Sequence, residues 1–477
     1  MRLPLLFAVI VLSFVRIRAA EIEPINELVS EGHWQQAQQK IEQALAQPEL
    51  RFQAREDLLF QRDRMTRMSL DFNKTREQVF QEVCATTPSI NEKQFADWEK
   101  VGALELLNID GTNRYFSQAA ANLFLINPEA RSLKMKLHPE AGPKPLYHVE
   151  DVRDVIANFD KTGQQFNSPR TWRVTYVLTV KPGIVPAGEI IRAWLPFPHV
   201  GGRQKGIRLI SADPPQVVML DTNAALASVY LEKPAASNQP TSFKIVFELT
   251  SAAFYEPIDS TRVQPEPAND PALAPFLGEE PPQIVFSDEI KNLSPKIVGD
   301  ETNPYLKARR IFEWTFQHIP WASAREYSTI ECLPRYALAC GHGDCGIKTM
   351  TFMTLCRFNG IPTRWETGWT TDPVEDMHDW CEIYLAPYGW VPVDVTYGLV
   401  DSRNEREKWF YLGNIDAARF VVNTDYAQPL YPAKTFFRSE IVDFQRGEVE
   451  WRGGNLYFNQ WSWDYNVKEI PPDRDGH

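Results

Sequence analysis

The chain has 477 residues, of which 43% are hydrophobic and 23% are charged, and its formal net charge is −12. This length exceeds what one hydrophobic core usually organises, so several domains are expected, and the composition is that of a globular protein rather than a disordered one. An excess of acidic groups repels phosphate backbones, which argues against nucleic acid as a partner.

Residues 1–20 have the character of an export signal. Arg2 precedes an apolar run over residues 3–15 that is too short to cross a bilayer comfortably, and Ala19 and Ala20 are small enough for cleavage. An uncleaved anchor is the alternative, because arginines follow the run. No later stretch is long and apolar enough for a membrane helix. We therefore expect a secreted or periplasmic protein with no stable membrane insertion after signal cleavage.

Residues 21–165 are expected to form a helical and mixed N-terminal region. Apolar residues recur at helical spacing from Ile25 to Leu45, in a stretch that resembles half of a tetratricopeptide unit. Only one copy is present, so a helical hairpin packed on the rest is favoured over a solenoid. Asp110-Gly111 is a turn signal between two short strands.

Residues 166–255 are expected to form a β-sandwich-like module, because apolar and polar residues alternate over 172–180 and 243–249. Residues 256–285 contain seven prolines and predict a Pro-rich linker laid along the surface at a domain boundary. Residues 286–477 are expected to form a further domain, the one that contains the motifs described below, with a strand-rich C-terminal extension. The aromatic side chains of that extension could form a sugar-binding platform, but core packing is favoured for them, above all for Trp461 and Trp463.

The segment 340–365 carries the strongest chemical signal. Cys345 lies among glycines and begins a mostly apolar run that ends at Asn359-Gly360, which predicts a buried helix with Cys345 at its N-terminus. The unpaired amides of a helix N-terminus stabilise a thiolate, lower the pKa of the thiol, and can bind an oxyanion. Asp344, a helix N-terminal charge, would oppose the formation of a thiolate beside it.

A cysteine nucleophile needs a base, and His378 lies in a strand-like run over residues 377–385. A turn follows, and the return strand over residues 390–396 brings Asp394 back alongside the strand of His378, although the sequence does not fix the register. An acid on the neighbouring strand would hold the imidazole in the tautomer that a thiol needs. We therefore predict Cys345 as nucleophile, His378 as base and Asp394 as the residue that orients the base.

These segments resemble the catalytic core of the transglutaminase-like superfamily of papain-like cysteine enzymes, in its bacterial exported type. The shared pattern is a Cys that opens a buried helix, then Arg, Gly-Ile-Pro-x-Arg, His-x-Trp-x-Glu and Gly-Trp-x-Pro-x-Asp-x-Thr. Here it is matched by Cys345, Arg357 and residues 360–364, 378–382 and 389–396. The resemblance covers about a fifth of the chain. It implies an α+β fold: a papain-like transglutaminase core with a preceding β-sandwich module and an N-terminal helical region.

The resemblance also implies a reaction in which the thiol forms a thioester with an amide carbonyl and water or an amine resolves it. Asp344 stands where cross-linking enzymes usually have Gln, and no calcium loop is visible, which favours hydrolysis of peptide or isopeptide bonds in a peptide or protein substrate. Trp321, Asp344 and Trp380 are candidate substrate-binding residues, with a core role as the alternative for Trp321. An inactive binding or scaffold protein and an amine-dependent cross-linker remain as alternative functions.

The chain has six cysteines, and a free catalytic thiol leaves an odd number, so at most two disulfides can form within the chain and only Cys332–Cys340 is a candidate. Five ligand-type side chains could instead hold zinc: Cys340, His342, Cys345, His378 and Cys381. This reading leaves Asp394 and the motif of Arg364 unexplained, so no metal and no cofactor is expected. His342 is then expected to be an exposed loop residue or one that shapes the entrance to the cleft. Glu382 could line the cleft or bond to Arg364, and the structural pairing with Arg364 is favoured.

Overall fold

The structure is a computed structural model that describes residues 22–142, 145–216, 218–219, 225–265 and 270–471. The predicted export signal, residues 1–20, lies outside the described residues. None of the helices in the described ranges combines the length and apolar character that a bilayer-crossing segment needs. The chain divides into two compact units, one made of residues up to 142 together with 322–330, and one made of 143–321 together with 331–477.

The first unit is mainly helical. Its described elements are a helix over residues 22–30, α2 (Trp34–Leu45), α3 (Phe52–Asp71), α4 (Arg76–Thr86), α5 (Glu92–Lys100), β1 (Leu106–Ile109), β2 (Thr112–Tyr115), α6 (Ala119–Ile126), α7 (Pro128–Leu137) and the 3-10 turns η1 (Pro139–Ala141) and η4 (Tyr327–Thr329). The predicted helical spacing is confirmed, because Ile25, Ala37 and Ile41 are buried in one cluster. Asp110 and Gly111 both have positive φ (47° and 82°) and form the expected tight turn between β1 and β2.

The segment 322–330 returns to this unit from a distant part of the sequence. Nδ2 of Asn122 donates to the carbonyl of Ser323 at 2.8 Å, and the buried guanidinium of Arg67 lies 3.0 Å from the carboxylate of Glu326. No local pattern in the sequence announces this return, because it depends on long-range packing. The expected N-terminal region, 21–165, therefore differs from the first unit at both ends, since α8 (Val149–Thr162) belongs to the second unit.

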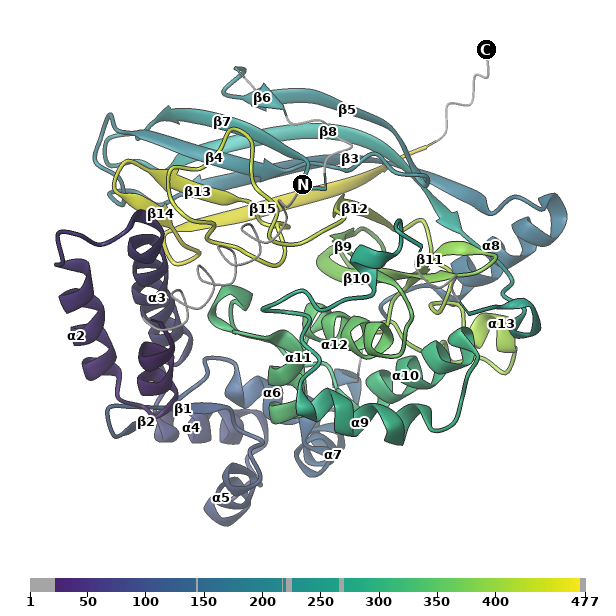
Figure 1. The fold of residues 1–477 in the computed structure, drawn as a ribbon, viewed down its shortest axis with the longest axis horizontal. Helices are drawn as coiled ribbons and strands as arrows, with labels where there is room; N and C mark the ends of the chain where they lie inside the picture. Colours follow the sequence, from purple (N-terminus) through teal and green to yellow (C-terminus); the bar gives the residue numbers. More distant parts are fainter. Residues whose placement is uncertain (1–21, 143–144, 217, 220–224, 266–269, 472–477) are drawn as a thin grey trace, which may run out of the picture. The chain divides into compact units, whose positions relative to one another are not determined.

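The second unit contains a β-sandwich built from two antiparallel sheets, drawn in teal and yellow in Figure 1. One sheet has the order β15-β3-β8-β5 and the other β14-β13-β4-β7-β6. The strands are β3 (Phe166–Val180), β4 (Ile190–Pro196), β5 (Gln204–Asp213), β6 (Val218–Met219), β7 (Ser228–Pro234), β8 (Thr241–Phe254), β13 (Glu448–Trp451), β14 (Gly454–Leu456) and β15 (Trp461–Ile470). Alternating side chains of β3 and β8, such as Val174 and Phe247, are buried between the sheets.

The C-terminal strands belong to this sandwich rather than to an extension of the catalytic domain, which corrects the expected boundary at residue 286. β13 pairs with β4, and β15 pairs with β3 along its whole length. Trp461 is 2% exposed within the sandwich core, and the half-buried Trp463 packs against the same core, as the favoured core-packing interpretation predicts.

The Pro-rich segment 256–285 also differs from the expected boundary linker. Both of its ends lie in the second unit, and its buried side chains include Val263, Leu273 and Ile284. Gln264 forms a backbone bridge with Ala386, so the segment packs along the catalytic sheet. It contains two 3-10 turns, η2 (Ser260–Arg262) and η3 (Ala274–Phe276).

The remainder of the second unit contains a four-stranded antiparallel sheet of order β11-β10-β9-β12 with helices packed against it (Figure 1). Its elements are α9 (Asp288–Val298), α10 (Pro304–His318), α11 (Leu333–Cys340), α12 (Cys345–Phe358), β9 (Thr363–Thr370), β10 (Asp376–Leu385), β11 (Gly389–Val393), α13 (Glu405–Lys408) and β12 (Arg419–Asn423). Gly368 of β9 must be glycine, because a Cβ there would lie 1.8 Å from the carbonyl oxygen of Phe420 on β12. The α+β class expected for the chain is confirmed.

Candidate active site

Cys345 is the first residue of α12, as predicted. Asp344 is the N-cap, and its carboxylate accepts a hydrogen bond from the amide of Ile347 at 3.3 Å. Gly343 precedes the cap, and a Cβ at that position would lie 2.3 Å from Cγ2 of Ile347, so only glycine lets the loop turn so tightly into the helix. Residues 346–357 are all buried, whereas Cys345 itself is half-buried. The helix therefore holds the thiol rigidly at the edge of the core.

The thiol of Cys345 contacts a carboxylate. Its Sγ donates to Oδ2 of Asp379 at 3.3 Å, and Oδ1 of the same carboxylate accepts a hydrogen bond from Nε2 of Gln445 at 3.0 Å. The hydroxyl of Thr349, one turn further along α12, donates to the backbone carbonyl of Asp379 at 3.2 Å. Helix α12 is thus fastened to β10 at the residue next to His378.

The environment of Cys345 opposes a thiolate more strongly than the helix N-terminus favours one. Burial, followed by the negative charges of Asp379 and Asp344, raises the pKa of the Cys345 thiol well above its ordinary value. The expectation of a lowered pKa took account of the helix amides and Asp344 but not of Asp379. Burial and the charge of Asp443 in turn raise the pKa of the Asp379 carboxyl.

His378 on β10 meets Asp394, which directly follows the neighbouring strand β11. The pairing of Cys381 with Val393 sets the register, and Nε2 of His378 lies 2.7 Å from Oδ2 of Asp394. Oδ1 of Asp394 accepts hydrogen bonds from the backbone amides of Thr396 and Tyr397, both at 3.0 Å. These amides fix the orientation of the carboxylate, which in turn fixes the imidazole plane and leaves Nδ1 as the ring nitrogen available for other chemistry.

Arg419 is a functional candidate that the sequence did not reveal. Its fully buried guanidinium donates from Nη1 to Oδ2 of Asp394 and lies 2.9 Å from Oδ2 of Asp416 through Nη2. Burial works to raise the pKa of Asp394, but the charges of His378 and Arg419 hold it well below its usual range. No signal could have found Arg419, because it follows the last recognisable motif and comes from a different strand, β12.

Two more side chains surround the His378–Asp394 pair. The ring of Tyr397 lies 4.9 Å from the imidazole of His378, and the guanidinium of Arg419 lies 4.2 Å from the centre of the Tyr397 ring. Lys348, one turn after Cys345, is only 2% exposed. Burial lowers the pKa of Lys348 to about 8 against the opposing charges of Asp394 and Cys345, so a titratable ammonium lies within the site.

The three candidate substrate-binding residues have different surroundings. Trp321 is 43% exposed and forms a backbone bridge with Gly343, so it lies beside the nucleophile loop with surface to offer. Asp344 is the N-cap described above. Trp380 is wholly buried, with its Nε1 donating to Glu366, and it presents no surface to a substrate.

The alternatives for the cysteines and for a metal gain no support. All six cysteines are free thiols, so Cys332 and Cys340 form no disulfide. In the described ranges, no group of three or more His, Cys, Asp or Glu side chains is arranged to hold a metal ion. His342 is 2% exposed and packs edge-on against Tyr336, which corrects the expectation of an exposed loop residue.

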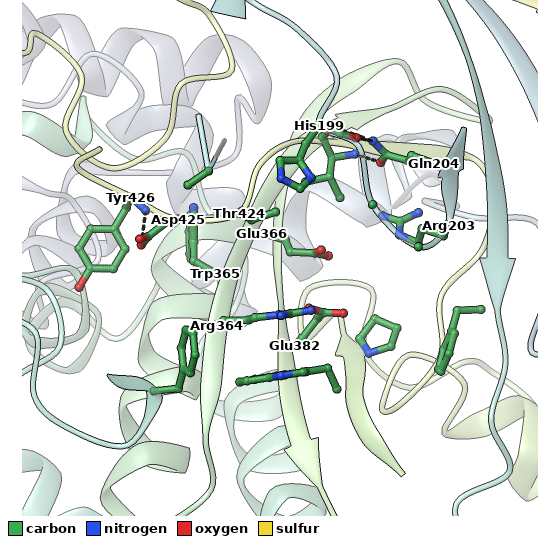
Figure 2. A pocket seen from close by; sticks show the side chains of 18 of the residues that line it. His199, Arg203, Gln204, Arg364, Trp365, Glu366, Glu382, Thr424, Asp425 and Tyr426 are labelled. Atoms are coloured by element: carbon green, nitrogen blue, oxygen red, sulfur yellow. Dashed lines mark hydrogen bonds and ion pairs between the residues drawn. The ribbon is translucent and has the colours of Figure 1, made fainter. Parts of the chain in front are cut away.

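A separate cavity of about 690 Å³ lies over β9, β10 and β11, and none of the three predicted catalytic residues lines it (Figure 2). Glu366 and Glu382 point into it, and Arg364 pairs with Glu382 as expected. The guanidinium of Arg364 lies 4.4 Å from the ring of Trp390. Burial and the charge of Glu366 raise the pKa of Glu382 to about 7.

Comparison with known proteins agrees with the sequence motifs. The model of the transglutaminase-like superfamily matches residues 291–395. An uncharacterised protein of Haemophilus influenzae is 29% identical over 149 residues, an alignment that covers 24% of this chain and 37% of that protein. The chain thus spans little more than a third of the length of this curated relative.

Solved structures with some similarity include a Cytophaga hutchinsonii protein described as a candidate cysteine protease, at 16% identity and a TM-score of 0.44, covering 65% of this chain and 94% of that one. The periplasmic domain of TgpA from Pseudomonas aeruginosa has 14% identity and a TM-score of 0.26, covering 54% of this chain and 94% of that one. The family match includes the helix of Cys345 and the strands of His378 and Asp394. Residues 291–395 therefore form a transglutaminase-like domain.

Proposed function

We propose that the chain is an exported, cysteine-dependent acyl-transfer enzyme that hydrolyses peptide or isopeptide amide bonds through a thioester on Cys345. The observation that supports it most directly is the His378–Asp394 pair at 2.7 Å, formed within the same domain that places Cys345 at the start of a buried helix. An oriented base and a cysteine at a helix N-terminus are the parts that thiol acyl transfer requires.

In the proposed reaction, His378 takes the proton of the Cys345 thiol and the sulfur attacks the amide carbonyl carbon. The C–N bond breaks, the leaving amine takes the proton from the imidazolium, and the acyl group stays on sulfur as a thioester. His378 then removes a proton from water, whose oxygen attacks the thioester, and the returning proton restores the thiol as the acid leaves. Asp394 keeps its charge throughout and stabilises the imidazolium.

The proposal requires Sγ of Cys345 to leave its hydrogen bond with Asp379 and turn towards His378. His378 directly precedes Asp379 on β10, so the base lies one residue along the strand from the present partner of the thiol. Hydrolysis is proposed over amine transfer because Asp344, rather than Gln, precedes the nucleophile. Export to the periplasm or the exterior is proposed from residues 1–20.

The test is labelling of the purified protein with a thiol-reactive probe, read by peptide mapping, alongside release of acid and amine from model amides. Cys345→Ser is expected to lose both label at that position and hydrolysis, His378→Ala to lose hydrolysis, and Cys332→Ser, the matched control, to keep both. Hydrolysis that persists in Cys345→Ser would overturn the proposal. Incorporation of a labelled primary amine into protein, without release of acid, would replace it with cross-linking.

A further inference from the structure

Asp379 occupies an unusual place, because it touches the atom that the proposed reaction uses first. It lies between His378 and Trp380 on β10, is 1% exposed, and accepts the hydrogen bond of the Cys345 thiol at 3.3 Å. Because neighbouring residues of a strand point to opposite faces, Asp379 turns towards α12 whereas His378 turns towards Asp394. The thiol therefore has an acidic neighbour on one side of the strand that carries its base.

Gln445 fixes this arrangement from outside the matched domain. Its Nε2 donates to Oδ1 of Asp379 at 3.0 Å and to the backbone carbonyl of His378 at 2.8 Å. Gln445 is 3% exposed, and its own carbonyl accepts a hydrogen bond from Nε1 of Trp369 at 3.1 Å. One amide thus positions both the carboxyl beside the nucleophile and the backbone of the base.

The charged groups around Asp379 are mostly acidic. The carboxylates of Asp344, at the start of α12, and of Asp443, in the segment before β13, both raise the pKa of Asp379. Burial raises the pKa of Asp443 itself, and the positive charges of Arg438 and Arg446 oppose that rise. The charge of Lys348 on α12 interacts with that of Cys345. The hydroxyl of Thr367 on β9 is, like the amide of Gln445, a neutral hydrogen-bond partner of Asp379. Burial and the negative charge of Asp443 favour a protonated Asp379, as the raised pKa of its carboxyl reflects.

We propose that Asp379 is a further catalytic residue that sets when Cys345 can become a thiolate. As a carboxylate, it accepts the thiol hydrogen and opposes loss of the proton, because two negative charges would then stand 3.3 Å apart. As a carboxylic acid, it has a hydrogen to donate to the sulfur, and it stabilises the thiolate that forms when His378 takes the thiol proton. The reactive state therefore holds one proton on Asp379 and one on His378.

This inference rests on the proposed function only in treating Cys345 as the nucleophile. Its test is the rate at which iodoacetamide alkylates Cys345 between pH 4 and pH 10, with Cys345→Ser as the blank. Asp379→Asn keeps the acceptor for Gln445 and places an N–H donor beside the sulfur. The variant is expected to alkylate much like wild type at acidic pH, where Asp379 is protonated, and at least about tenfold faster at alkaline pH, where the wild-type Asp379 carboxylate opposes the thiolate, with the midpoint of its profile at least one pH unit lower.

Asp443→Asn provides a second variant with the opposite expected sign. It removes the negative charge that, after burial, does most to favour the protonated form of Asp379, so alkylation at pH 7 is expected to slow severalfold. An unchanged profile in Asp379→Asn, or a shift of both variants in the same direction, would overturn the role of Asp379. If the profiles shift as expected but no variant hydrolyses amides, the role of Asp379 stands and the proposed function fails.

Discussion

Oδ2 of Asp394 accepts hydrogen bonds from two side chains, through Nε2 of His378 and Nη1 of Arg419. The same oxygen therefore orients the predicted base and neutralises a buried guanidinium. Any change at Asp394 must disturb both the site and the packing of β12 against β9, whereas changes at Arg419 reach the imidazole only through the carboxylate.

Replacing Asp394 by Asn should separate its chemical role from its packing role. An Asn side chain can still accept the hydrogen bonds of the Thr396 and Tyr397 amides, but it cannot stabilise an imidazolium. We expect kcat/KM for amide hydrolysis to fall by about 10³-fold to 10⁴-fold. Steady-state kinetics would measure this, with Asp464→Asn on the exposed side of β15 as the matched control. A loss below tenfold would show that Asp394 does not orient the base.

Arg419 should be important for stability. In Arg419→Met, both Asp394 and Asp416 lose a buried cationic partner, which is expected to lower the free energy of unfolding by about 3–5 kcal/mol. Adding Asp416→Asn removes one of the two stranded charges, so the double variant should regain part of that loss. Urea denaturation followed by tryptophan fluorescence would measure both. Equal stabilities of Arg419→Met and wild type would contradict the ion-pair network.

Lys348 should reduce stability at neutral pH. The pKa of Lys348 is about 8 in the folded chain, below its ordinary value of 10.5. Below pH 8 the ammonium must be buried in its charged form, which opposes folding in full. This cost disappears as the pH rises to about 10.5. Lys348→Met is therefore expected to be more stable than wild type by up to about 3 kcal/mol at pH 7, and by much less at pH 10. Thermal unfolding at both pH values would measure this. Lys296→Met, at an exposed position of α9, is the control and should show no such pH dependence.

Glu448 should make the sandwich sensitive to acid. Although burial opposes it, the charges of Arg438 and Lys434 lower the pKa of Glu448 from 4.5 to about 2. Its contribution is therefore complete above about pH 4.5 and lost as the pH falls towards 2. Glu448→Gln is expected to lose about 2–3 kcal/mol of stability at pH 7 and to differ little from wild type at pH 2. Denaturant titrations at the two pH values would check this, and a constant difference between the proteins would contradict it.

The sequence predicted those features that depend on local pattern. The limits of α12 follow from the glycines before Cys345 and from Asn359-Gly360 after it, and the hairpin of β10 and β11 follows from its turn and its alternation. The pairing of His378 with Asp394 was expected from the hairpin, and the register that realises it needed the structure.

What the sequence did not predict depends on residues brought together from distant segments. Arg419 and Gln445 reach the site from β12 and from the segment before β13, and neither belongs to a recognisable motif. Asp379 lies within the predicted strand-like run 377–385, but its contact with Cys345 depends on how α12 packs across the sheet. Likewise, the C-terminal stretch was expected to be strand-rich and aromatic, but nothing in the sequence showed that the partner of β15 is β3.

The pairing of β15 with β3 has a consequence for how the chain acquires its structure. The sandwich sheet that begins at β3 cannot gain its edge strand until residues 461–470 have been synthesised, after the whole catalytic segment. Contacts between segments this far apart close slowly, because ordering the intervening chain costs entropy before the contacts stabilise it. Until then the backbone N–H and C=O groups along that edge of β3 lack their partners, so the sheet is completed only after the last strand of the chain has been made.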